Sequence, residues 1–170
     1  KPTSGKILVD GIILSNSNET NWRKKIGYVP QKVYITNDTL RNNIALGVDK
    51  KDIDDVKIME IIKKTNLTNF RSREEQSNIM DVKLNDRGLN ISGGELQRIA
   101  LARSLYIDSE ILVLDEATNS LDRENKEILI KNVFDLFKDK TIIFISHEEN
   151  AFKFCNKIFE LKNNEFHKIK

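Results

Sequence analysis

The feature that most constrains the fold is an apolar run that ends in two acids, Ile111-Leu112-Val113-Leu114-Asp115-Glu116. Four consecutive aliphatic residues are typical of a strand buried on both faces of a parallel sheet. Ligand sites in open α/β sheets form at the carboxyl ends of such strands. Asp115 is therefore a candidate ligand for Mg²⁺, and Glu116 is a candidate for orienting or deprotonating an attacking water. Taken alone, the run fits equally well a strand that ends in solvated acids.

The segments around this run predict an α/β protein with a helical part. Asp10-Gly11 between two short apolar runs predicts a hairpin. Further strands are expected at 26–29, 141–145 (a second buried strand) and 158–161, and helices at 39–46 (capped by Asp38 or Thr39), 52–65, 92–106, 123–137 and 148–154. The alternation of strands and helices after residue 107 is the α/β pattern. We expect an α/β core at 1–47 and 107–170 and a helical subdomain at 48–106.

A second candidate site is the tetrapeptide Ser92-Gly93-Gly94-Glu95 at the start of a predicted helix. The two glycines let the backbone approach an anion closely, and free N–H groups at a helix start attract phosphate. The hydroxyl of Ser92 adds a further donor. A simpler interpretation is an ordinary serine N-cap followed by a glycine-rich turn, and for these residues alone it is the favoured one.

Together with their surroundings, these segments resemble the ABC ATPase family. Residues 91–95 resemble its signature, with Ile for the usual Leu and Glu for the usual Gln, and Asp115-Glu116 is similar to the end of its Walker B strand. Three other motifs resemble its D-loop, switch-histidine motif and Q-loop, namely Asn119-Ser120-Leu121-Asp122, Ile145-Ser146-His147 and Tyr28-Val29-Pro30-Gln31. All five occur in the family's order and at its usual spacing, and the resemblance covers nearly the whole chain. It implies a P-loop NTPase-like ABC ATPase core with a mainly parallel sheet plus a helical subdomain.

The resemblance also implies a role for each side chain of the catalytic group. Gln31 would contact Mg²⁺ or the attacking water through its amide, and His147 would hydrogen-bond the γ-phosphate of ATP. Glu116, His147 and Gln31 are therefore the candidate catalytic residues, and Asp115 and Gln31 the candidate metal ligands.

The signature and the D-loop imply a partner subunit. In the family, the signature of one nucleotide-binding domain completes the ATP site of a second, head to tail. Ser92, Gly93, Gly94 and Glu95 are thus expected to contact nucleotide held by the other domain, and Asp122 is expected to help couple the two.

Two further segments point to an exporter. Residues 39–44 (Thr-Leu-Arg-Asn-Asn-Ile) resemble exporter-type domains, where this stretch faces the coupling helices of a transmembrane domain. Residues 85–88 (Asn-Asp-Arg-Gly) are similar to the exporter pattern, with Asn and Asp in place of the usual Gly and Glu. The resemblance implies an ATPase at the cytoplasmic face of a membrane that powers substrate translocation. Lipid, lipid-linked sugar, peptide and drug export all stay open.

No stretch of the sequence fits the phosphate-binding loop G-x-x-x-x-G-K-[ST]. The near match is Gly5-Lys6, but Ile7 stands where Ser or Thr is needed. In the family, residues 2–6 look like the stretch after the P-loop helix, so we expect the first core strands and the P-loop upstream of Lys1. The isolated chain is therefore expected to be inactive, because the P-loop supplies most of the phosphate contacts.

Composition narrows the alternatives. The net charge is +2 with acids and bases interspersed, which argues against nucleic acid as a partner. The single cysteine, Cys155, allows no internal disulfide and favours a reducing, cytoplasmic setting. Two other hypotheses remain open: a soluble ABC ATPase acting on DNA or ribosomes, and a truncated interaction module without catalysis.

Overall fold

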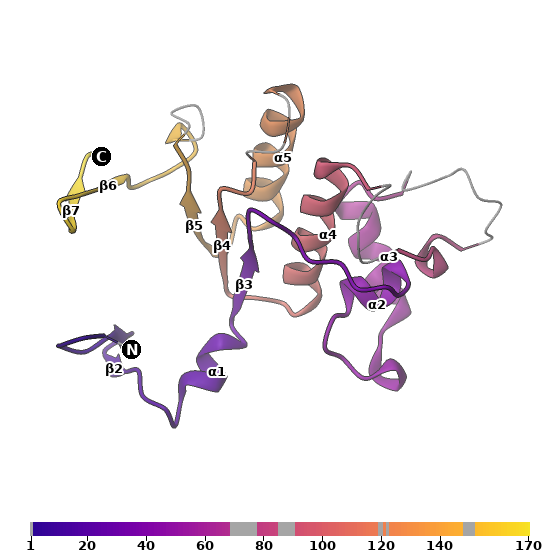
Figure 1. The fold of residues 1–170 in the computed structure, drawn as a ribbon, viewed down its shortest axis with the longest axis horizontal. Coiled ribbons are helices and arrows are strands. Elements are labelled where there is room, and N and C mark those ends of the chain that lie inside the picture. The colour runs from indigo at the N-terminus through magenta and orange to yellow at the C-terminus, as the bar shows by residue number, and fades with distance from the viewer. Residues whose placement is uncertain (1, 69–77, 85–90, 119–120, 122, 148–151) are drawn as a thin grey trace.

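A three-stranded parallel sheet of order β3-β4-β5 lies at the centre of the computed structural model (Figure 1). The structure describes residues 2–68, 78–84, 91–118, 121, 123–147 and 152–170. The strands are β3 (Ile26–Val29), β4 (Ile111–Asp115) and β5 (Thr141–Ile145). Their register is set by Ile111 at the start of β4, which pairs with Ile26 on one side and with Thr141 on the other. All three strands were predicted, and their parallel arrangement confirms the expected α/β core.

One face of this sheet packs against two helices, α4 (Gly93–Tyr106) and α5 (Arg123–Leu136). Leu112 and Leu114 of β4 are buried there together with Val133 of α5. The predicted burial on both faces is wrong for β5, since Ile143 and Ile145 each remain 48% exposed. Side chains alternate across a strand, and these two isoleucines point to the face opposite α4 and α5.

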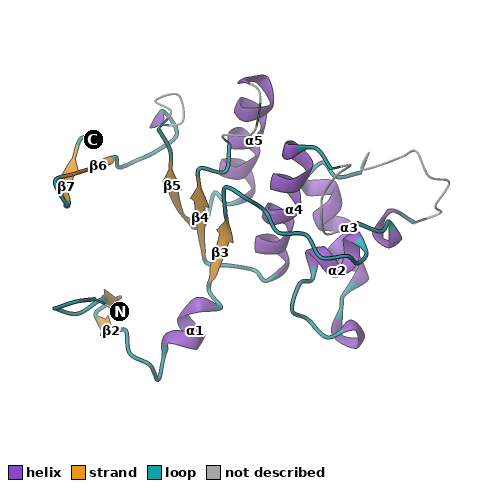
Figure 2. Cartoon of the chain, viewed as in Figure 1, coloured by secondary structure: helices purple, strands orange, loops and turns teal. Residues whose placement is uncertain are grey.

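The helical part of the chain lies on the other side of α4 (Figure 2). It contains α2 (Leu40–Ile44), α3 (Asp55–Lys64) and two short 3₁₀ turns, η1 (Lys50–Asp52) and η2 (Ile79–Asp81). The face of α3 predicted to be apolar is buried at Ile58, Ile61 and Ile62. The helix begins at Asp55 rather than 52, because η1 precedes it and the side chain of Asp54 accepts the Lys57 N–H as its cap.

The cap of α2 is Thr39 rather than Asp38. The hydroxyl of Thr39 accepts the backbone N–H of Asn42 at 3.2 Å, whereas Asp38 accepts from the Thr39 N–H and the Asn42 side chain. A side-chain acceptor at this position satisfies a backbone donor that the helix leaves unpaired. Of the two predicted caps, the second is therefore confirmed.

Helix α4 takes part in both hydrophobic clusters. Ile99 and Ala102 pack among the helices, whereas Ala100 and Leu101 pack against the sheet. Residues 1–47 also contribute to both clusters, through Val29 in the sheet and α2 among the helices. The division into a core and a subdomain at 48–106 stays a prediction, and α4 is the element where the two parts join.

A partly buried cation links α4 to α2 and to the segment that precedes α2. The guanidinium of Arg103 donates to the Asn43 carbonyl and to the Tyr34 carbonyl, both at 2.7 Å, and to the Asn43 side-chain oxygen at 3.1 Å. Burial lowers the pKa of Arg103 to about 10, so the group stays charged at neutral pH. Asn43 is itself fully buried, and its amide also bonds to the backbone of Thr36, Asp38 and Thr39.

The N-terminal hairpin was predicted, and the structure confirms it. Strands β1 (Leu8–Val9) and β2 (Ile12–Ile13) pair antiparallel around Asp10 and Gly11, whose φ angles are +48° and +79°. Two positive φ angles are what a tight two-residue hairpin requires. A short helix, α1 (Glu19–Arg23), follows and was not predicted.

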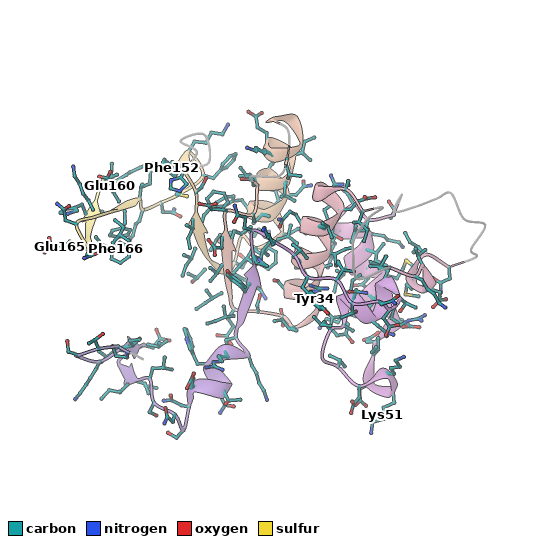
Figure 3. The ribbon with its side chains drawn as sticks, in the orientation of Figure 1. Tyr34, Lys51, Phe152, Glu160, Glu165 and Phe166 are labelled. Carbon is teal, nitrogen blue, oxygen red and sulfur yellow. The ribbon has the colours of Figure 1, made fainter. Side chains whose placement is uncertain are left out.

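The strand predicted at 158–161 forms, but it does not join the parallel sheet as the predicted alternation of strands and helices implied. Strand β6 (Phe159–Lys162) pairs with β7 (Glu165–Lys168) in an antiparallel hairpin separate from the sheet of β3, β4 and β5. Asn163 and Asn164 both have positive φ and form the turn, a signal that the sequence analysis missed. Figure 3 shows Glu165 and Phe166 on this hairpin, far from the helices. Of the helix predicted at 148–154, residues 148–151 lie outside the described residues.

None of the helices in the described ranges combines the length and the apolar character needed to cross a bilayer.

Gly27 of β3 provides a test of the packing between sheet and α4. A Cβ at Gly27 would lie 2.6 Å from Ser109 Oγ and 2.7 Å from Ser104 Cβ, both on buried residues. We expect Gly27→Ala to lower the free energy of unfolding by about 1–3 kcal/mol, because the backbone must shift to relieve the overlap. Urea unfolding followed by circular dichroism measures this change.

The matched control is Gly94→Ala. Among the described residues, a Cβ there would meet only a Leu121 methyl group at 3.4 Å, and alanine is favoured in a helix. Its unfolding midpoint should stay near that of the unsubstituted chain. Equal losses in the two variants would contradict the close approach at Gly27.

Candidate active site

The predicted catalytic side chains lie at one edge of the sheet. Gln31 follows β3 by two residues, Glu116 follows β4 directly, and His147 follows β5 by two residues. The carboxyl ends of parallel strands meet at a common edge, so three segments far apart in sequence deliver these side chains together. The sequence predicted this grouping, and the contacts below show its geometry.

Glu116 is bonded on both of its carboxylate oxygens. The amide nitrogen of Gln31 donates to Oε2 at 3.0 Å, and Nε2 of His147 lies 3.1 Å from Oε1. The His147 side chain is 90% exposed, whereas that of Glu116 is 25% exposed. The carboxylate is therefore held in one orientation between an amide and an imidazole, with the imidazole on the solvent side.

The backbone of Glu116 is in the left-handed region, with φ at +48°. This conformation costs roughly 1–2 kcal/mol for a residue with a Cβ, and such strain concentrates at functional sites. The Glu116 N–H donates to the carbonyl of Ile145 at 3.0 Å, so the neighbouring strand β5 holds the turn in place. The strained turn directs the carboxylate toward Gln31 and His147.

Asp115 has a partner that the sequence analysis did not identify. The phenol of Tyr28 donates to Asp115 Oδ2 at 2.7 Å. This hydrogen bond raises the pKa of Tyr28, with smaller contributions from burial and from the negative charge of Asp115. Tyr28 pairs with Val113 in register, so it lies on the same sheet face as Asp115 two residues further on. That strand periodicity is the signal that could have found it.

The donor set at this edge suits Mg²⁺. Asp115 supplies carboxylate oxygens, and Gln31 presents its amide nitrogen to Glu116, so its amide oxygen points elsewhere. Mg²⁺ prefers such oxygen ligands, takes few from the protein and keeps several waters. Tyr28 bonds one of the two Asp115 oxygens. Within the described ranges, no group of three or more His, Cys, Asp or Glu side chains is placed to hold a metal ion.

Ser92 forms a capping box with Glu95 at the start of α4. Its hydroxyl accepts the Glu95 N–H at 3.3 Å and donates to Glu95 Oε2 at 2.7 Å, and its own N–H donates to the same oxygen at 2.7 Å. The simpler N-cap interpretation of Ser92 is therefore realised in the structure. Gly93 and Gly94 form the first turn of α4, and Gly94 lies against Leu121.

Several predicted positions lie outside the described residues. Asp122 and its neighbours Asn119 and Ser120 are among them, as is the exporter-like segment at 85–88. Leu121, between them, packs against the sheet cluster.

Comparison with known proteins gives the class of this chain. The sequence profile of the family described as "ABC transporter" matches residues 1–119. The chain therefore belongs to the ABC transporter family, and it corresponds to the ATP-binding part of that family.

Two relatives illustrate what the chain is similar to. The chain is 37% identical over 157 residues to the heterocyst differentiation ATP-binding protein HepA of Nostoc sp., covering 92% of this chain and 25% of that protein. It is 35% identical over 159 residues to the ATP-dependent lipid A-core flippase of Pseudoalteromonas translucida, covering 93% of this chain and 27% of that protein. The chain thus spans about a quarter of the length of these relatives.

A solved structure confirms the fold. A bacterial Atm1-family ABC exporter with ATP bound superposes with a TM-score of 0.84 at 30% identity, covering 98% of this chain and 29% of that chain. The ABC ATPase fold predicted from the five motifs is therefore confirmed.

The bond between Tyr28 and Asp115 predicts an altered titration. The hydrogen bond favours the neutral phenol, so the pKa of Tyr28 is raised. The stability that this hydrogen bond adds to the folded chain is lost as pH rises through that raised pKa. In Asp115→Ala we expect the Tyr28 phenolate to form at lower pH than in the unsubstituted chain. Ultraviolet absorbance titration measures phenolate, and Tyr28→Phe assigns the signal. An unchanged midpoint in Asp115→Ala would show that the bond is absent in solution.

Proposed function

We propose that this chain is part of the nucleotide-binding domain of an exporter-type ABC transporter, which hydrolyses ATP to power substrate translocation. The observation that carries the proposal is the placement of Glu116 between Gln31 and His147 at the carboxyl edge of a parallel sheet. Relatives named as a lipid A-core flippase and as a lactococcin-A transport/processing protein support the exporter class.

Each side chain of the site has a part in the proposed reaction. Glu116 accepts a proton from the water that attacks the γ-phosphorus, while the bond to the β-phosphate oxygen breaks and ADP leaves. Gln31 orients Glu116 and the water, and His147 donates to the γ-phosphate. Asp115, with the Gln31 amide oxygen, would hold Mg²⁺, which supplies charge neutralisation at the phosphates.

The proposed assembly needs two partners. A second nucleotide-binding domain would receive Ser92, Gly93, Gly94 and Glu95 at its nucleotide, in a head-to-tail dimer with Asp122 near the junction. For this contact, the Ser92 hydroxyl exchanges its bond to Glu95 for one to a phosphate oxygen. A transmembrane domain would contact the surface around α2 and choose the substrate, which places the chain at the cytoplasmic face of a membrane.

Replacing the proposed general base tests the proposal. In the full-length protein that contains this chain, Glu116→Gln should lower the ATP turnover rate by roughly 10²–10⁴-fold, because an amide cannot accept the proton. A dimer with ATP bound should accumulate, and size-exclusion chromatography with nucleotide analysis detects it.

Glu110→Gln is the matched control for this experiment. Glu110 precedes the other end of β4 and forms an exposed ion pair with Lys25, so its loss should leave turnover near normal. Unchanged turnover in Glu116→Gln would refute the assignment of the catalytic carboxylate.

A second test concerns the 170 residues alone. They contain no G-x-x-x-x-G-K-[ST] loop, so we expect no binding of Mg-ATP in the micromolar range and no hydrolysis. Isothermal titration calorimetry measures the affinity, with the full-length protein as the positive control. Micromolar binding of Mg-ATP by the isolated chain would contradict the expectation and show that other residues bind the phosphates.

A further inference from the structure

Gln97 is a buried amide in the second turn of α4, with 2% of its surface exposed. Its nitrogen donates to the backbone carbonyl of Gln31 at 3.3 Å and to that of Pro30 at 3.5 Å. Its oxygen is buried and has no hydrogen-bond partner in the described part of the chain. A buried acceptor without a partner is unfavourable, so packing alone would favour an apolar residue here.

The two carbonyls fix the orientation of this amide. Carbonyl oxygens only accept hydrogen bonds, so the nitrogen must face Pro30 and Gln31 and the oxygen must point away. The unpaired oxygen is thus a consequence of placing a donor against the backbone of Gln31. This backbone follows the end of β3, and the Gln31 side chain is exposed. Gln97 therefore anchors an otherwise exposed turn to the interior of the protein.

Gln97 also connects the segment proposed to contact the nucleotide of a second domain with the catalytic carboxylate proposed for this chain. It lies five residues after Ser92, about 7.5 Å along the same helix. The bonds run from α4 through Gln97 to the backbone of Gln31, and from the Gln31 side chain to Glu116 Oε2. The start of α4 and the catalytic carboxylate are joined by one rigid helix and two hydrogen bonds.

We propose that Gln97 is a positioning residue for ATP hydrolysis, which holds the Gln31 amide against Glu116 from the side of α4. The inference rests on the proposed function, because it assigns Gln97 to the same reaction. Gln97 acts through Gln31 and makes no contact with the reacting atoms in this assignment. The Gln31 amide is proposed to orient Glu116 and the attacking water in the chemical step. Displacing this amide should therefore lower kcat more than it changes KM.

The test is Gln97→Met in the full-length protein. Methionine has nearly the same length and flexibility, removes the donor to Gln31, and also removes the unpaired oxygen. We expect an unchanged or higher Tm, a kcat for ATP lowered about tenfold or more, and a KM within about threefold of normal. A purely structural role would instead make kcat follow Tm.

Two further variants complete the experiment. Ile99→Val on the same helix removes a buried methyl group from the helical cluster without touching Gln31, and it should lower Tm with kcat unchanged. Gln97→Met should have little added effect in a Gln31→Ala background, because both act through one side chain.

Different results would overturn different claims. A normal kcat in Gln97→Met, a loss that tracks a lower Tm, or full additivity with Gln31→Ala would overturn the role of Gln97. If Glu116→Gln keeps full turnover, the proposed function itself fails. If Glu116→Gln abolishes turnover while Gln97→Met is normal, only the inference about Gln97 fails.

Discussion

The packing of α4 on two sides is the constraint on which the rest of the structure depends. Ile99 and Ala102 bury one side among the helices, while Ala100 and Leu101 bury the other against the sheet. A helix enclosed in this way has little freedom to shift, because close-packed interiors resist displacement. Arg103 then links this helix to α2 through the Asn43 carbonyl and to the preceding segment through the Tyr34 carbonyl. The helical part and the sheet are thereby held together by a single shared element.

At the carboxyl edge of the sheet, the position of Glu116 is set by contacts from the segments around β3 and β5. Two hydrogen-bonding partners occupy the two oxygens of Glu116, and the left-handed turn that presents it is bonded to β5. Preorganised groups of this kind need little rearrangement when charge develops in a reaction. At the start of α4, Glu95 satisfies Ser92, so the same residues stabilise the helix and are proposed to act on nucleotide of a second domain. Stability and proposed function therefore compete for one hydroxyl.

Most local signals were interpreted correctly from the sequence, with helix α1 and the turn between β6 and β7 as exceptions, and the covering of the sheet was predicted less well. The apolar face of α3, the Ser92 cap and the hairpin at Asp10-Gly11 depend on residues within one or two turns of each other. The second hairpin at β6 and β7 was missed, since its two asparagines were not recognised as a turn. The burial of β5 was overestimated, because an apolar run does not reveal how many faces of a sheet are covered.

The sequence by itself determined the class of this protein, through five short motifs in a fixed order, and also the identity of Gln31, Glu116 and His147 as one group. The tertiary structure alone decided how these side chains meet. Gln31 and Glu116 are 85 residues apart, Tyr28 and Asp115 are 87 apart, and Gln97 and Gln31 are 66 apart. Periodicity and capping act over a few residues, whereas these contacts require three parallel strands and a buried helix to be in place. Strand periodicity could have placed Tyr28 and Asp115 on one sheet face, whereas the contact of Gln97 with the backbone of Gln31 follows only from the tertiary structure.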